Sequence, residues 1–85
     1  MSIRGLAALP LALLLATPAL AGRDPTPEER PAIEAALRAV GFERWDDIEL
    51  ENGLWEVDDA RTADGRKWDL RLRPGTLEIT ERRPD

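Results

Sequence analysis

Hydrophobic and polar residues alternate along the second half of the chain, and an Asn-Gly pair divides the alternation into two strands. Residues 48–51 and 54–61 alternate on either side of this pair, which is the strongest two-residue signal for a β-hairpin turn. A turn at residues 52–53 places Leu50 opposite Trp55 and puts the apolar residues of both strands on one face. The predicted pairs are Glu51–Leu54, Leu50–Trp55, Glu49–Glu56 and Ile48–Val57.

Two further strands are predicted after turn signals. Residues 66–72 follow an Asp-Gly turn at residues 62–65, and residues 77–82 follow a Pro-Gly turn at residues 73–76. Loops with an even number of residues keep every apolar set on one face, whereas an odd loop would bury charge. The expected pairs are Val57 with Leu70 or Leu72, Leu72 with Leu77, and Leu70 with Ile79.

The predicted apolar face comprises Ile48, Leu50, Trp55, Val57, Trp68, Leu70, Leu72, Leu77 and Ile79. The predicted outer face carries Glu49, Glu56, Asp58, Asp69, Arg71, Glu78, Thr80 and Arg82, with Arg71 between Glu56 and Glu78.

Upstream of the strands, residues 26–40 have the pattern of one amphipathic helix. Thr26 fits the N-cap, Pro27 the first helical position, and Glu29 the capping box. Gly41 fits the C-cap, and Trp45 in the connection at 43–47 is expected to cover one end of the core. The apolar stripe consists of Ile33, Ala36, Leu37 and Val40. We therefore predict an α+β fold in which one N-terminal helix packs on a four-stranded antiparallel β-meander.

The N-terminal residues have the three-part pattern of a secretory signal peptide. Arg4 precedes an apolar run at residues 6–15, and Ala-Leu-Ala at residues 19–21 matches a cleavage site. The run is too short and too interrupted by proline to span a bilayer. We expect cleavage near Ala21 and release into the periplasm or the medium, without a membrane anchor. The expected organisation is a signal peptide at 1–21, a polar lead at 22–25, the folded domain at 26–82 and a frayed tail at 83–85.

Composition narrows the classes of function. The 85-residue chain has a formal net charge of −5 and contains neither cysteine nor histidine, which removes disulfides, thiol chemistry and the most common metal ligands. Its acidity argues against nucleic acid as a partner. No serine follows the predicted cleavage site, and Lys67 is the one lysine of the chain. We therefore assign no catalytic residue, cofactor or metal ligand and expect a non-enzymatic protein; its oligomeric state stays open.

Four residues are the candidate interaction sites. Trp45 is either a lid on the core, which the small size of the domain favours, or an exposed binding anchor. Glu56 and Asp58 mark the acidic outer face. Asp59 has the parity of the core face, so it lies either at the open edge of that face or in a bulge that turns it outward. Asp58 and Asp59 followed by Asp64-Gly65 are better explained by a turn than by a calcium loop. A free edge strand at residues 48–51 or 77–82 offers a further route to a partner, by strand addition.

Several short segments form a series that runs through about residues 26–82. They are Glu28-Glu29-Arg30, Gly41-Phe42, Ile48-Glu49-Leu50, Trp55-Glu56-Val57, Ala63-Asp64-Gly65-Arg66-Lys67, Asp69-Leu70 and Gly75-Thr76-Leu77-Glu78-Ile79. This series resembles the PepSY domain, in particular the small stand-alone PepSY proteins that bacteria export behind a signal peptide. The chain departs from commoner members at Arg73-Pro74-Gly75, where an acidic residue often precedes a small-residue turn, and in having tryptophans where tyrosine is frequent.

The resemblance implies a function rather than a set of site residues. PepSY domains occur in the propeptides of thermolysin-like metallopeptidases, and an inhibitory or regulatory action on peptidases has been proposed for them. The family defines no catalytic residues to transfer. The expected function is that of an exported, non-enzymatic binding module that inhibits or modulates a periplasmic peptidase. The alternative is an acidic periplasmic module that senses a ligand or cation.

Overall fold

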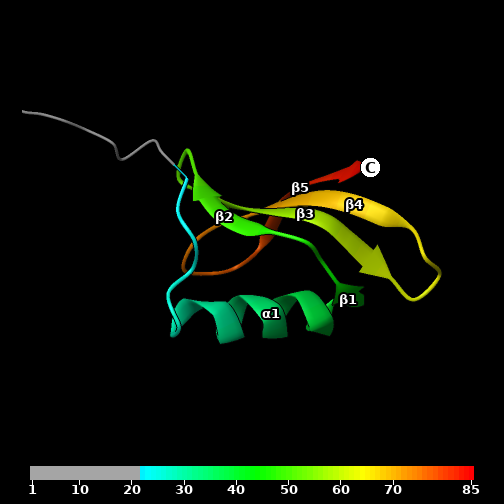
Figure 1. Ribbon diagram of the computed structural model, residues 1–85, viewed down its shortest axis with the longest axis horizontal. Coiled ribbons are helices and arrows are strands. Elements are labelled where there is room, and N and C mark those ends of the chain that lie inside the picture. Colours follow the sequence, from blue (N-terminus) through cyan, green and yellow to red (C-terminus); the bar gives the residue numbers. More distant parts are fainter. Residues whose placement is uncertain (1–21) are drawn as a thin grey trace, which may run out of the picture.

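One helix lies across one face of an antiparallel sheet in the computed structural model, which describes residues 22–85 (Figure 1). The elements are the helix α1 (Glu29–Ala39) and the strands β1 (Phe42–Arg44), β2 (Ile48–Glu51), β3 (Leu54–Thr62), β4 (Lys67–Leu72) and β5 (Ile79–Pro84). The predicted α+β class is confirmed. The sheet has five strands rather than four, because the connection after the helix contributes the short strand β1. The predicted signal peptide lies outside the described residues.

The helix begins with the predicted capping box. The backbone N–H of Glu29 donates to Thr26 Oγ1 (3.1 Å), and the backbone N–H of Thr26 donates to Glu29 Oε1 (2.9 Å). Ile33 and Leu37 are buried against the sheet. Val40, predicted on the same apolar stripe, is instead 53% exposed, because α1 ends at Ala39 and the chain then reverses through Gly41 at φ +100°. Within the described part of the chain, no helix is long and apolar enough to cross a membrane.

The central hairpin has the predicted register. All four pairs from Ile48–Val57 to Glu51–Leu54 are formed, and the turn residues Asn52 and Gly53 both have positive φ, at 52° and 79°. Positive φ at both central positions is the requirement of a type I′ turn. On the other side of β3, Val57 pairs with Leu70, which is one of the two expected partners.

A bulge in β3 resolves the position of Asp59. Val57 pairs with Leu70 and Ala60 with Trp68, so that two residues of β3 lie opposite the single residue between those partners on β4. Asp59 has φ 53° and is turned off the core face, and Ala60 takes the buried position instead. Of the two alternatives for Asp59, the outward bulge is the observed one.

The predicted register of the last strand is wrong. Leu72 pairs with Ile79 rather than Leu77, and Leu70 pairs with Arg82 rather than Ile79. The loop before β5 is longer than expected, because Leu77 adopts φ 61° and donates its N–H to the carbonyl of Arg73 at 2.8 Å.

Arg82 is consequently not on the outer face. A further irregularity near Thr80 leaves Arg82 opposite buried Leu70, and its guanidinium lies over the rings of Phe42 (5.4 Å) and Trp68 (5.7 Å). The strand also continues through Arg83 and Pro84, which the sequence places in a frayed tail.

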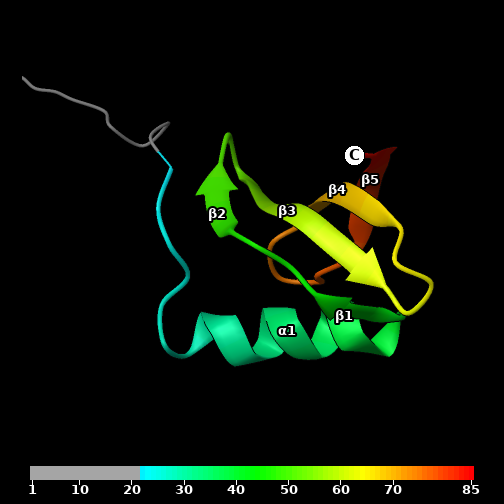
Figure 2. The same cartoon turned by 45° about the vertical axis from the view of Figure 1, so that its right-hand side comes forward.

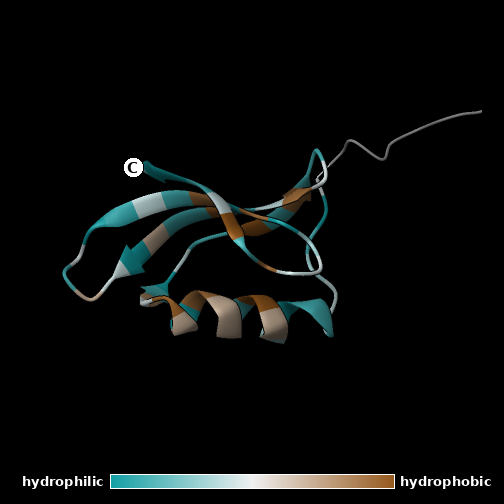
Figure 3. Cartoon of the chain, turned by 180° about the vertical axis from the view of Figure 1, so that it is seen from behind, coloured by the Kyte–Doolittle hydropathy of each residue, from teal (hydrophilic) through white to brown (hydrophobic). Residues whose placement is uncertain are grey.

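The core lies between α1 and the facing side of the sheet, as the turned view and the hydropathy colouring show (Figures 2 and 3). Leu50, Trp68, Leu77 and Ile79 from the predicted apolar face are half-buried against it. The fully buried residues are Ile33, Leu37, Phe42, Ile48, Trp55, Val57, Ala60, Leu70 and Leu72.

The lead before the helix is tied to the sheet through Arg23. Its backbone exchanges two hydrogen bonds with Leu50 of β2, at 3.2 and 2.8 Å, so the lead covers part of the β2 edge (Figure 1). The guanidinium bonds both carboxylate oxygens of Glu29, at 2.9 and 3.2 Å, and lies over the ring of Trp55 at 5.4 Å. These hydrogen bonds, together with that from the backbone of Thr26, lower the pKa of Glu29 to about 2.

We expect Arg23→Gln to weaken the fold in a pH-dependent way. The pKa of Glu29 lies below its ordinary value of 4.5, so the ionised carboxylate stabilises the folded state above that pH. This contribution is lost as pH falls toward 2. Unfolding free energies from urea titrations should therefore differ most between the native protein and Arg23→Gln at pH 7. The difference should shrink toward pH 2, to the part that the contact of Arg23 with Trp55 supplies at every pH.

The control for this prediction is Arg73→Gln, which makes the same change of net charge in the loop before β5. A constant difference between native protein and Arg23→Gln across the pH range would contradict the proposed role of the Arg23–Glu29 contact.

Candidate functional site

The predicted acidic face is present on the outer side of the hairpin. Glu56 is half-buried and lies 3.5 Å from the guanidinium of Arg71. Arg71 also reaches Glu81 at 3.5 Å, whereas the predicted second partner, Glu78, instead pairs with Arg73 at 3.7 Å. The change of partner follows from the shifted register of β5.

Asp58 lies further along β3 in a field of like charge. Desolvation against the sheet raises the pKa of Asp58, and the carboxylates of Asp69 and Asp47 raise it further. A carboxyl pair that transfers protons needs a water-excluding cleft that drives the two pKa values apart. Glu56 and Asp58 lie instead on an open strand, and this arrangement suits contact with a cationic surface.

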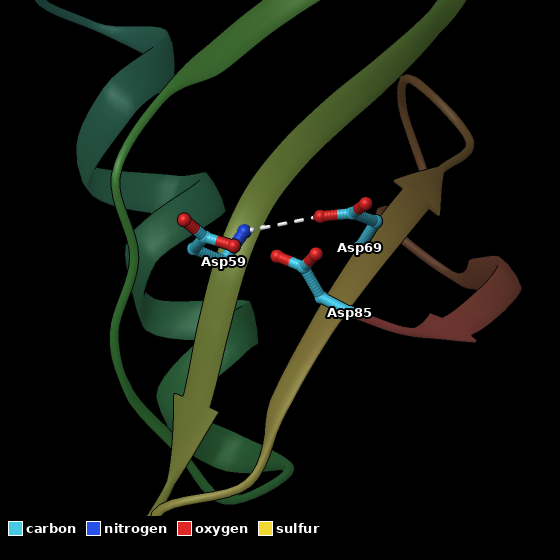
Figure 4. A group of neighbouring side chains, drawn as sticks. All are labelled: Asp59, Asp69 and Asp85. Carbon is cyan, nitrogen blue, oxygen red and sulfur yellow. Dashed lines mark hydrogen bonds between the residues drawn. The ribbon is translucent and has the colours of Figure 1, made fainter.

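Three aspartates meet on the sheet, from β3, β4 and the C-terminal residue (Figure 4). One carboxylate oxygen from each of Asp59, Asp69 and Asp85 lies within 4.8 Å of the others. The backbone N–H of Asp59 also donates to Asp69 Oδ1 at 3.2 Å. Carboxylate oxygens are the ligands that Ca²⁺ prefers. Of the three aspartates, the sequence analysis chose only Asp59 as a candidate interaction residue and placed Asp69 on the outer face of the sheet. Asp85 reaches the group through the register of β5, for which the sequence carries no local signal.

Asp64 takes no part in this group. Its Oδ1 accepts hydrogen bonds from the hydroxyl of Thr62 and from the backbone N–H of Arg66, the latter at 3.1 Å. These bonds, with the Thr62 bond the larger cause, lower the pKa of Asp64. The structural interpretation of the Asp64-Gly65 turn is therefore confirmed.

Trp45 is both packed and accessible. It is half-buried against the core, and the guanidinium of Arg38 lies over its ring at 5.1 Å. Its remaining surface lines a polar pocket of about 350 Å³ at the C-terminal end of α1. The pocket is lined by Glu34, Arg38, Glu43, Arg44, Trp45, Asp46 and Arg61.

A second, mainly apolar groove lies at the other end of the helix. Its volume is also about 350 Å³, and Arg23 and Glu29 are among its lining residues. No sequence pattern predicts this groove, because it forms where the lead and the loop before β5 approach α1. The apolar part of its lining comprises Ala32, Ile33, Leu50, Trp55, Pro74 and Leu77.

The four candidate interaction residues lie on adjoining segments. Glu56, Asp58 and Asp59 follow one another along β3. The connection that carries Trp45 is tied to that strand by two hydrogen bonds, from Asp46 N–H to the Asp58 carbonyl (2.9 Å) and from Asp58 N–H to the Asp47 carbonyl (3.0 Å). The structure thus joins these segments, and the roles of the four residues stay predictions.

We expect Asp59→Asn to stabilise the protein when no divalent cation is added. The substitution removes one of three neighbouring negative charges, and asparagine tolerates the positive φ of this position. The gain in unfolding free energy should be about 0.2–1 kcal/mol, the size of a cross-strand charge pair. Urea titration in the presence of EDTA measures it.

The matched control is Asp59→Ala, which removes the same charge but is strained at positive φ. Asp59→Ala should therefore be less stable than Asp59→Asn. A loss of stability in Asp59→Asn would show that the carboxylate supports the fold.

Comparison with known proteins identifies the family. No curated protein and no solved structure matches the chain. A family model described as the peptidase propeptide and YPEB domain, PepSY_2, matches residues 5–83. The match spans nearly the whole chain and agrees with the resemblance found in the sequence, so the chain belongs to the PepSY family of peptidase propeptide and YPEB domains.

Proposed function

We propose that this chain is an exported, non-enzymatic binding module that inhibits or modulates a periplasmic peptidase. The observation that carries the proposal is the family match over residues 5–83, since the family is one of peptidase propeptide domains and is not catalytic. Export is supported by the signal-peptide pattern of residues 1–21.

The fold supports a binding role through the surfaces that the helix leaves open. α1 covers only one face of the sheet, and the other carries Glu56 and Asp58. Trp45 presents a half-buried aromatic ring next to this strand, and partly exposed tryptophans are frequent anchors of protein interfaces. Addition of a partner's extended segment as a further strand is hindered at the edges formed by β2 and β5. Arg23 already pairs with β2, and Pro84 removes a hydrogen-bond donor from β5.

The purified protein should lower the activity of a co-exported peptidase at stoichiometric concentration. We expect Trp45→Ala to weaken inhibition about tenfold or more, the effect of removing an aromatic anchor. Glu56→Gln should weaken it less, because this residue lies on an exposed face. A panel of peptidases from a periplasmic extract, assayed with increasing amounts of the protein, measures both effects.

Glu78→Gln is the control for Glu56→Gln, because it removes the same charge from an exposed loop site. Photo-crosslinkers at positions 45 and 56 then locate the contact on a captured peptidase. A folded protein that changes no activity in the panel and captures no peptidase would refute the proposal.

Cation sensing is the second candidate function, and the meeting of Asp59, Asp69 and Asp85 favours it. Calcium at about 100 times its dissociation constant should add roughly 2.7 kcal/mol to the unfolding free energy. Asp59→Asn should abolish this gain, while Glu78→Gln should retain it. Thermal unfolding with and without millimolar calcium, with magnesium for comparison, makes the test; equal midpoints with and without calcium would exclude the site.

A further inference from the structure

Two arginines of the Trp45 pocket lie directly opposite each other in the sheet. Arg44 of β1 is the register partner of Arg61 of β3, and both line the pocket together with Arg38 of α1. Like charges at directly opposite positions destabilise a pair of strands. Among residues 22–85, no carboxylate lies within ion-pair distance of either arginine to offset this repulsion.

These two arginines are also exceptional among the arginines of residues 22–85. Each of the others either forms an ion pair with a carboxylate or lies over an aromatic ring. Within the same range, Arg44 and Arg61 do neither. Their guanidinium groups carry five donors each, so the pocket holds recognition groups that the described fold does not use.

The charges of the pocket favour a single added negative charge. Three lining residues are arginines and three are acids, but Glu34 is already paired with Arg30 at 3.3 Å. Glu43 and Asp46 form no ion pair within the described part of the chain. The three arginines therefore exceed the two uncommitted acids by one charge. A monoanion balances this excess, whereas a dianion would leave the pocket with one uncompensated negative charge.

We propose that this pocket binds a carboxylate of an extended peptide segment from a protein partner. The guanidinium forks of Arg44 and Arg61 bind the carboxylate, and the exposed part of Trp45 packs against the adjoining residue of the peptide. The carboxylate comes from an acidic side chain or from a free C-terminus. This inference goes beyond the proposed function, since it specifies the recognised chemistry without requiring the partner to be a peptidase.

The test uses NMR, because the chain has three tryptophans and each gives one indole N–H signal. The probes are a capped pentapeptide with one glutamate, the same peptide with glutamine, an uncapped peptide without acidic side chains, and inorganic phosphate. We expect the Trp45 signal, assigned from Trp45→Phe, to move with the glutamate peptide, the free C-terminus or both. The glutamine peptide should leave it in place, and the buried Trp55 should not respond.

Variants then tie the response to the two arginines. Arg44→Gln combined with Arg61→Gln should weaken binding about tenfold or more, the loss expected for charge-assisted hydrogen bonds. Arg73→Gln makes one such charge change outside the pocket and should bind as the native protein does. Higher salt should also weaken binding. The amide spectrum reports folding of each variant, and either single substitution serves if the double variant does not fold.

Three results would overturn the inference. They are a response to the glutamine peptide as large as that to the glutamate peptide, native affinity in the folded variants of Arg44 and Arg61, and no response to either the glutamate peptide or the uncapped peptide, whether or not phosphate gives one. Failure of peptidase inhibition would leave these measurements unaffected, so the two proposals fail separately.

Discussion

The burial of a single sheet face beneath α1 is the constraint on which the rest of this structure depends. With no cysteine in the chain, the domain has no disulfide, and the hydrophobic contact of Ile33 and Leu37 with the strands is its principal source of stability. Side chains of a strand point alternately to the two faces, so every strand must keep its apolar residues in one parity. The Asn52-Gly53 turn fixes this parity for β2 and β3, and β4 inherits it through Val57–Leu70.

The irregularities of the sheet are consequences of the same constraint. In β3, two aspartates separate Val57 from Ala60, and strict alternation would direct Asp59 into the core. Burying an unpaired carboxylate costs several kcal/mol, whereas a residue at positive φ costs about 1–3 kcal/mol, and aspartate is among the residues that adopt it most readily. The bulge is therefore the less costly arrangement, and it places Ala60 in the core. The same bulge brings Asp59 to Asp69, so a packing requirement also created the acidic group.

Strong local signals account for the features that were predicted correctly, whereas distant pairing and an unusual backbone conformation account for those that were not. The capping box at Thr26 and the hairpin register each depend on residues a few positions apart, and both are present. The short strand β1 depends on pairing with the far end of β3. The register of β5 depends on the loop before it, in which Leu77 has a positive φ that leucine rarely adopts. The same distinction holds for the candidate site. Glu56 and Asp58 could be identified because alternation along a single strand places them on the outer face. The position of Asp85 and the opposition of Arg44 to Arg61 could not be predicted, because both depend on how strands pair.

Arginine has an unusual structural task in this protein. One short helix cannot cover all the aromatic surface of the core, and guanidinium groups cover much of the remainder: Arg23 lies over Trp55, Arg38 over Trp45, and Arg82 over both Phe42 and Trp68. Such contacts combine cation–π attraction with burial of the aliphatic stem, so they stabilise the rim without placing charge in the core. Contacts with aromatic rings explain most of the arginines that lack a carboxylate partner. They do not explain Arg44 and Arg61, whose like charges lie opposite each other across β1 and β3. A small domain is only marginally stable, yet this one keeps a repulsive pair of charges at a pocket beside an accessible tryptophan. We therefore assign these two residues to recognition rather than to the fold.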